Sequence, residues 1–205
     1  MSTFAAADLE LLSELSRSNQ IGHLAIVSRD GYPRTVPMNF VLVGDRIYFH
    51  GAPDGEKAEA LARGDRVTFC VYTALAATPS YWRSANYACP ASQYFRSALV
   101  RGRGGVVRDA GEKAAALQAL MEKHQPEGGF ERIDPANPLY SKALEETAVF
   151  RINIERIDTR AKLGQNLSEA TRRTVIEKLV KRDGPGDAET ARLMAQVKPV
   201  KLEEE

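Results

Sequence analysis

The sequence predicts a mainly β protein with flanking helices, built on a small antiparallel barrel of six strands. Short β-rich runs follow one another across tight turns, few helical segments separate them, and the last run alternates cleanly between apolar and polar residues. A chain of 205 residues with 43% hydrophobic residues is long enough for one core. We expect an N-terminal helix over residues 1–20, the barrel over 21–160 and a helical extension over 161–205.

The first third of the chain changes from helical to strand periodicity. Leu9, Leu12 and Leu15 recur at helical spacing and predict an amphipathic N-terminal helix. The segment HLAIVSRDGYPRTVPMNFVLVGDRIYFHG then contains three short β-rich runs. Asp30-Gly31 and Gly44-Asp45 separate these runs, and aspartate with glycine favours tight hairpin turns. This segment therefore predicts three consecutive antiparallel strands.

Three further strands complete the predicted barrel. RVTFCVY, residues 66–72, follows a short helix that begins near Gly55. The glycine-rich run SQYFRSALVRGRGGVV predicts a long strand that bends near residues 102–105. In TAVFRINIERID, apolar and polar residues alternate, which is typical of a half-buried strand.

Two helices flank the last of these strands. EKAAALQALMEK, residues 112–123, is a strong helix by propensity and pattern. Residues 168–181 form the second predicted helix, and Ser168 is its expected N-cap.

Composition excludes several classes of protein. Lys and Arg number 28 against 27 Asp and Glu, which argues against a dedicated nucleic-acid binder. The two cysteines make no disulfide scaffold, and the three histidines have no spacing that suggests a shared metal. The N-terminus lacks the pattern of a signal peptide, and no apolar stretch is long enough for a membrane span. We expect a cytoplasmic protein.

The segment from Arg34 to Lys57 carries the candidate site. Pro37 inside a strand removes a ladder donor, so it predicts an edge, a bulge or a neighbouring ligand. The corner after His50 resembles a phosphate-binding loop, but Gly51 and Gly55 are too close together for that motif. Helix N–H groups and the Lys57 ammonium would still suit a phosphate monoester. The alternatives are a plain edge strand, a solvated Lys57 and a structural His50.

The order RTVPMNF, RIYFHG, EKAEAL, RVTFCVY and YFRSALVRGRG resembles the flavin-binding split-barrel proteins related to pyridoxamine 5'-phosphate oxidase. The resemblance covers roughly residues 22–160 and is spread over five strands. It is greatest to the nitroimidazole-reductase branch, which has a histidine at the end of the third strand. Lys162-Leu163-Gly164-Gln165-Asn166 is similar to the KxxQN element of related FMN-binding transcriptional regulators.

The resemblance implies a split barrel that forms a homodimer with FMN at the subunit interface. His50 would be the catalytic residue and would supply a proton to the substrate. The residues implied to contact FMN come from several strands and from the KxxQN element: Arg34, Thr35, Val36, Pro37, Met38, Asn39, Phe49, His50, Gly51, Lys57, Arg96, Ser97, Gln165 and Asn166. Arg96 and Ser97 would reach the flavin of the partner subunit. Asn39, in place of a lysine, argues against pyridoxamine-phosphate oxidase activity itself.

These expectations define two functional hypotheses. The first is an FMN-dependent oxidoreductase or flavin reductase that takes electrons from NAD(P)H and acts on small electron-poor substrates such as nitroaromatics or quinones. The second is a non-catalytic flavin- or haem-binding sensor or transcriptional regulator, which the KLGQN segment favours. Neither hypothesis requires a membrane, and the balanced charge argues against nucleic acid as a partner.

Overall fold

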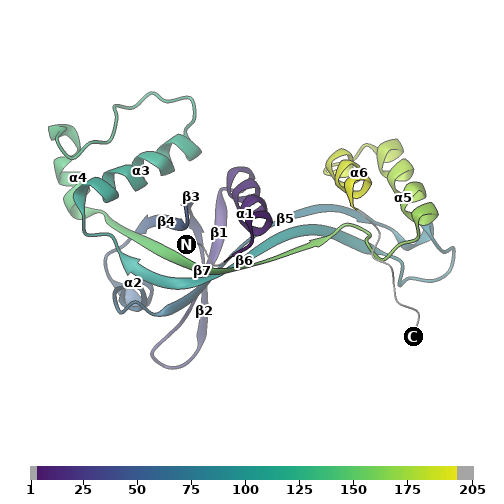
Figure 1. Cartoon of the computed structure of the whole chain (residues 1–205), viewed down its shortest axis with the longest axis horizontal. Coiled ribbons are helices and arrows are strands. Elements are labelled where there is room, and N and C mark those ends of the chain that lie inside the picture. Colours follow the sequence, from purple (N-terminus) through teal and green to yellow (C-terminus); the bar gives the residue numbers. More distant parts are fainter. Residues whose placement is uncertain (1–3, 198–205) are drawn as a thin grey trace. The chain divides into compact units, whose positions relative to one another are not determined.

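The computed structural model describes residues 4–197, whose strands belong to one sheet and whose helices are labelled in Figure 1. The sheet has seven strands in the order β2-β1-β5-β6-β7-β4-β3. The strands are β1 (Ile21–Val27), β2 (Pro33–Asn39), β3 (Val41–Val43), β4 (Arg46–Gly51), β5 (Arg66–Thr78), β6 (Ser92–Val106) and β7 (Ala148–Lys162). The helices are α1 (Ala6–Ser18), α2 (Gly55–Ala62), α3 (Ala110–His124), α4 (Ser141–Glu146), α5 (Glu169–Arg182) and α6 (Asp187–Gln196), with 3-10 turns η1 (Ser80–Trp82) and η2 (Pro138–Tyr140).

The order of the strands explains why the sheet curls. β2 and β3 stand at opposite ends of the order, yet Phe40 alone separates them along the chain. The two edges of the sheet must therefore approach each other at this residue, which makes the sheet a half-barrel. The paired strands β1 and β2, β1 and β5, β3 and β4, and β4 and β7 are antiparallel. The predicted fold class is confirmed, with seven strands instead of six because the second predicted run divides at Phe40.

The two predicted hairpin turns form as expected. Between β1 and β2, Gly31 has a φ of 86°, and the Ser28 N–H donates to the Tyr32 carbonyl at 2.9 Å. Between β3 and β4, Gly44 has a φ of 62°. Glycine adopts such positive φ values without the strain that a Cβ would bring. These turns fix the register of β2 on β1, in which Pro37 faces His23. Pro37 lies on an edge strand, which has no neighbour on its outer side, so the missing N–H of proline is tolerated there.

Aromatic side chains dominate the core of the barrel. Phe40, Phe49 and Phe69 are fully buried, and Phe150 is 1% exposed. The ring centroids of Phe40 and Phe69 lie 4.9 Å apart, and those of Phe49 and Phe150 lie 5.9 Å apart. Helix α1 covers this core with two buried leucines of the predicted N-terminal helix, Leu12 and Leu15. Each side chain of this size contributes roughly 1.5–3 kcal/mol when fully buried.

The described residues form two compact units. The first comprises residues 4–71 and 98–159, and the second comprises residues 72–97 and 160–197. Strands β5, β6 and β7 each pass from one unit into the other. β5 extends to Thr78, six residues beyond its predicted end.

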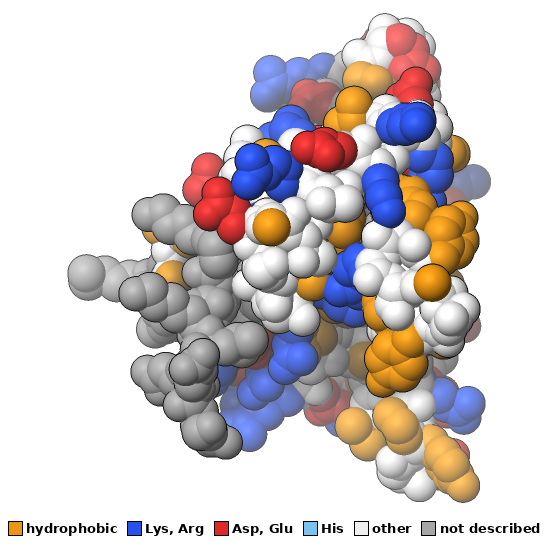
Figure 2. Space-filling view, turned by 90° about the vertical axis from the view of Figure 1, so that its right-hand side faces the viewer, with side chains coloured by type: hydrophobic (Ala, Val, Ile, Leu, Met, Phe, Trp, Pro, Cys, Tyr) orange, Lys and Arg blue, Asp and Glu red, His pale blue; other side chains and the backbone are white. Residues whose placement is uncertain are grey.

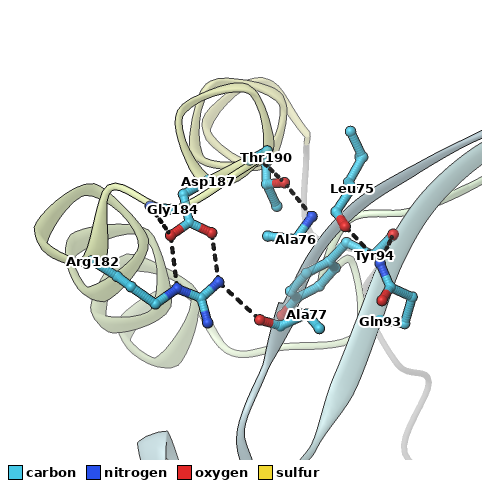
Figure 3. A network of polar contacts seen from close by, with 10 residues as sticks. Leu75, Ala76, Ala77, Gln93, Tyr94, Arg182, Gly184, Asp187 and Thr190 are labelled. Carbon is cyan, nitrogen blue, oxygen red and sulfur yellow. Dashed lines mark hydrogen bonds and ion pairs between the residues drawn. The ribbon is translucent and has the colours of Figure 1, made fainter.

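In the second unit, α5 and α6 pack side by side and bond to the strands (Figure 3). Ser168 caps α5 as predicted, since its hydroxyl accepts from the Thr171 N–H. The Asp187 carboxylate is fully buried and accepts from Arg182 Nε at 2.7 Å. Thr190 Oγ1 accepts from the Ala76 N–H of β5 at 2.9 Å. Helix α6 was not predicted, because its polar residues are buried in these contacts while its sequence resembles a surface segment.

The surface on the side of α5 and α6 is chemically mixed (Figure 2). Lys and Arg side chains lie among Asp and Glu side chains there, and hydrophobic side chains are exposed beside them. The exposed large hydrophobic residues of the second unit are Tyr72, Tyr81, Tyr87 and Val180.

Among residues 4–197, no helix combines the length and the apolar character that crossing a bilayer requires.

Candidate functional site

At the corner between β4 and α2, the N-terminus of the helix has no side-chain cap. Strand β4 ends at Gly51, and α2 begins at Gly55, whose φ of 83° turns the chain into the helix. Asp54 occupies the N-cap position, but its side chain makes no capping hydrogen bond. The first N–H groups of a helix lack partners within the helix and carry a partial positive charge. This corner therefore presents uncapped amides.

Lys57 lies in the first turn of α2 and folds back over the end of β4. Its Nζ is packed so tightly on Gly51 that a Cβ at that position would collide with it. The Nζ also lies 5.4 Å from the centroid of the Phe150 ring. Burial lowers the pKa of Lys57. The alternative of a freely solvated lysine is therefore wrong, because this ammonium is half-buried beside the uncapped amides.

Ion pairs tie α2 to the hairpin of β1 and β2. Arg34 Nε lies 3.3 Å from a Glu56 carboxylate oxygen, and Arg29 lies 3.0 Å from Glu59. Exposed pairs of this kind contribute at most about 1 kcal/mol each. Their geometric effect is larger, since they hold Arg34 against the first turn of α2. The Glu56 carboxylate, which would oppose an anion, is engaged by Arg34.

Strand β2 presents alternate residues to the two sides of the sheet. Thr35, Pro37 and Asn39 are exposed, whereas Met38 is 8% exposed and belongs to the core. Val36 is half-buried and packs on the same core. Period-two alternation on a half-buried strand produces this division. Contacts from Met38 and Val36 to a ligand outside the barrel would therefore come from the backbone.

Strand β4 differs, because the consecutive residues Ile47, Tyr48 and Phe49 are all buried and exposure begins only at His50. The Phe49 side chain points into the core, and the next residue, His50, is exposed. His50 faces Val149 of β7, and Gly51 faces Ala148. The structure brings Phe49, His50 and Gly51 to the same corner as Lys57, as the sequence predicted.

Two residues at the end of α3 lie near this strand and were missed by sequence reasoning. Burial, the Lys123 ammonium and the charge of His50 all lower the pKa of His124, which places the two histidines within electrostatic reach of each other. The Nε2 atom of His124 is buried without a hydrogen-bond partner among the described residues. Nothing in the sequence links positions 50 and 124, since the proximity arises from packing of α3 on the sheet.

The remaining predicted contacts lie in the second unit. Arg96 and Ser97 are half-buried on β6. The Gln165 side chain folds onto its own loop: its Oε1 accepts from the Leu163 N–H at 2.8 Å, and its Nε2 donates to the Ala161 carbonyl at 2.5 Å. Asn166 lines a cavity of about 130 Å³ within this unit.

A larger cavity opens on the barrel unit, with a volume of about 550 Å³. Its lining residues come from β1, β2, β5, β6 and β7: Ala25, Ile26, Val27, Pro33, Arg66, Val67, Thr68, Arg101, Gly102, Glu155 and Arg156. None of the predicted flavin contacts is among them. The candidate site at the β4–α2 corner is thus distinct from this cavity.

The family of the chain follows from comparison with known proteins. The family model described as pyridoxamine 5'-phosphate oxidase matches residues 8–161. The chain belongs to this family. The match spans the barrel and includes the β4–α2 corner, so the resemblance stated from the strand sequences is confirmed. A search of curated proteins gives no significant match.

Solved structures share the fold of this family member. A candidate 5-nitroimidazole antibiotic resistance protein from Bacteroides thetaiotaomicron is 25% identical, with a TM-score of 0.55 over 73% of this chain and 81% of that chain. The FAD and heme binding protein from Mycobacterium smegmatis is 23% identical, with a TM-score of 0.61 over 75% and 70%. The flavocytochrome Anf3 from Azotobacter vinelandii is 24% identical, with a TM-score of 0.60 over 75% and 66%. The last two, at this identity, establish the fold alone.

Proposed function

We propose that the protein is a flavin-binding oxidoreductase that holds FMN at the β4–α2 corner. The observation that carries this proposal is the half-buried Lys57 ammonium beside the uncapped N-terminus of α2, in a chain of the pyridoxamine 5'-phosphate oxidase family. The names of two structural neighbours add support, since one is an FAD and heme binding protein and the other a flavocytochrome.

The residues of the corner fit the phosphate of FMN. Helix N–H groups and a cation together favour a phosphate monoester. Lys57 makes no ion pair with a carboxylate in the described part of the chain, and burial lowers its pKa, so an anion would stabilise its charged form. Arg34 lies beside the same turn through its pair with Glu56. Gly51 leaves the space that the Lys57 Nζ occupies.

The flavin ring would lie along the exposed edge of the sheet. Thr35, Pro37 and Asn39 offer a face of β2 without bulky core side chains, and Val36 and Met38 offer backbone groups. Phe49, His50 and Gly51 would follow the ring along β4. We further propose that a second copy of the chain completes the site, with Arg96 and Ser97 reaching across, while Gln165 and Asn166 close it. The open edge strand β2 is compatible with such a homodimer.

A bound flavin supplies the two-electron redox chemistry, with NAD(P)H as the proposed electron donor and small nitroaromatics or quinones as acceptors. The protein then supplies orientation and a proton. His50 is exposed at the end of β4 and can deliver a proton from its imidazole to a substrate placed above the sheet. The positive charge of His50 also helps to lower the pKa of His124, after burial and the charge of Lys123.

Absorption spectroscopy and a flavin titration test the proposal. Freshly purified protein is expected to be yellow and to bind FMN at one equivalent per chain. Lys57→Met should weaken FMN binding about 10- to 100-fold, the loss expected for one charged hydrogen bond. Lys142→Met removes an exposed lysine that pairs with Glu146 and is the matched control. Protein that stays colourless with added FMN would contradict the proposal, as would equal affinities of both variants.

A flavin- or haem-binding sensor is the second candidate, since both cofactors occur in the names of structural neighbours. An exposed histidine such as His50 is a possible axial ligand for haem iron. Steady-state oxidation of NAD(P)H with a nitroaromatic or a quinone separates the two candidates. Cofactor binding without turnover would favour the sensor, and a Soret band in place of flavin absorbance would identify haem.

A further inference from the structure

A third cavity lies between α1, β3 and the C-terminal end of α3. Its volume is about 390 Å³, it is open to solvent, and its lining residues all belong to the barrel unit. The lining residues are Ser13, Ser16, Arg17, Val41, Leu42 and Lys123. None of them belongs to the proposed flavin contacts. The lining combines two cationic side chains, two hydroxyl groups and an apolar wall, and it contains no carboxylate.

The two cations of this cavity have only neutral partners. Arg17 Nη1 donates to Ser13 Oγ at 3.2 Å. Lys123 Nζ donates to the Phe40 carbonyl at 2.6 Å and lies 3.7 Å from the centroid of the Phe40 ring. Within residues 4–197, neither side chain forms an ion pair with Asp or Glu. These contacts hold the two charges in place, and among the described residues no carboxylate neutralises either of them.

Burial makes the charge of Lys123 costly. Its side chain is half-buried, and desolvation lowers its pKa from 10.5 to about 8. The charge of Lys123 also helps to lower the pKa of the neighbouring His124. A buried ammonium is normally paired with an anion. The cavity supplies space for such an anion directly beside Lys123.

A structural explanation for these cations is that they complement the negative ends of the helix dipoles of α1 and α3. Basic residues in a last helical turn commonly bind the free carbonyl groups there. The observed contacts differ from that pattern. Arg17 donates to the side chain of Ser13, and Lys123 reaches across to the carbonyl of Phe40 between β2 and β3. Neither cation therefore binds the free carbonyl groups at the end of its own helix in the contacts described above.

We propose that this cavity binds a small organic oxyanion, a carboxylate or a phosphate monoester. Arg17 and Lys123 hold the charged head group, and the hydroxyls of Ser13 and Ser16 complete its hydrogen bonds. Val41 and Leu42 receive the apolar part of the molecule. The site is separate from the flavin corner at Lys57 and goes beyond the proposed function.

Calorimetric titration of the full-length protein at low ionic strength tests this site. The probes are phenyl phosphate, benzoate and uncharged benzyl alcohol. At least one of the two anions should bind at one equivalent per chain, and the tighter of the two identifies the preferred head group. Arg17→Gln and Lys123→Met should each weaken binding about tenfold or more, as expected when a charged hydrogen bond is lost. The titrations are made with FMN at saturation, so that the corner at Lys57 is filled, and under this condition Lys142→Met and Lys57→Met should bind the probes as the wild type does.

The outcomes separate this site from the flavin corner. Loss of binding in Lys57→Met alone would place the probe at the flavin corner and overturn the proposal. Equal binding of benzyl alcohol, absence of saturable binding of both anions, or affinities unchanged by Arg17→Gln would also overturn it. If Lys123→Met fails to fold, Arg17→Gln decides, because Arg17 is exposed and its replacement leaves the core intact.

Discussion

Replacing Lys123 by methionine should change how the stability of the protein depends on pH. In the folded protein, burial lowers the pKa of Lys123 from 10.5 to about 8. Between these values the unfolded chain binds more protons at this position than the folded chain does. The free energy of unfolding therefore rises with pH across this window. Below pH 8, the folded protein bears the full cost of the buried ammonium.

The size of this change in the free energy of unfolding follows from the lowered pKa of Lys123. A difference of 2.5 pH units corresponds to roughly 3 kcal/mol for a fully desolvated group. Because the Lys123 side chain is only half-buried, solvent screening reduces this to about 1–2 kcal/mol. Lys123→Met keeps the length and apolar character of the side chain and removes the titration. Wild-type stability should rise relative to this variant by about 1–2 kcal/mol from pH 7.5 to 10.5.

Urea denaturation at half-unit pH intervals measures this difference. The comparison with the variant cancels other groups that titrate in the same range. A difference that is independent of pH, or one that falls as pH rises, would refute the reasoning. Lys142→Met, which removes an exposed lysine, is the control. A change of the same size in that variant would show that burial of Lys123 is not the cause.

Two further predictions concern packing and charge in the sheet and the second unit. Gly102→Ala should destabilise the protein by roughly 2 kcal/mol or more in urea denaturation, because the new Cβ would collide with the Asn153 carbonyl oxygen of β7. Gly105→Ala is the matched control, since its Cβ would meet nothing closer than 3.7 Å. Asp187→Asn should weaken α6 by about 1–3 kcal/mol in amide hydrogen exchange, because it breaks the pair with Arg182. Arg182 holds the pKa of Asp187 below its usual 3.8, so the stability that this ion pair contributes decreases as the pH falls below that value.

The parts of the fold that the sequence predicts are those with a local signal. The hairpin turns have Asp-Gly and Gly-Asp at their corners, and Ser168 precedes a helical pattern as a cap. β7 alternates between apolar and polar residues, and Leu12 and Leu15 lie at helical spacing. In each case the residues that carry the signal are neighbours along the chain. Local chemistry is therefore sufficient to predict these elements.

The division at Phe40 has no comparable signal. The run from Thr35 to Val43 is continuous in β propensity, and one strand is the natural interpretation. The chain divides there because β2 pairs with β1 and β3 pairs with β4, at opposite edges of the sheet. Only the closure of the whole sheet imposes this division. The same closure brings Lys123 to the Phe40 carbonyl, so the oxyanion cavity was equally hidden.

Charge counting along the sequence also hides the two proposed anion sites. The chain is almost neutral, with 28 basic and 27 acidic residues, and many of its arginines pair with carboxylates at the surface. Lys57 and Lys123 differ from those residues, because each is half-buried and burial alone lowers its pKa. A group whose charge the fold makes costly, and for which no carboxylate compensates, favours binding of an anion from solution. The same physical argument thus supports the flavin phosphate at Lys57 and the oxyanion at Lys123, and each lysine can be removed without touching the other.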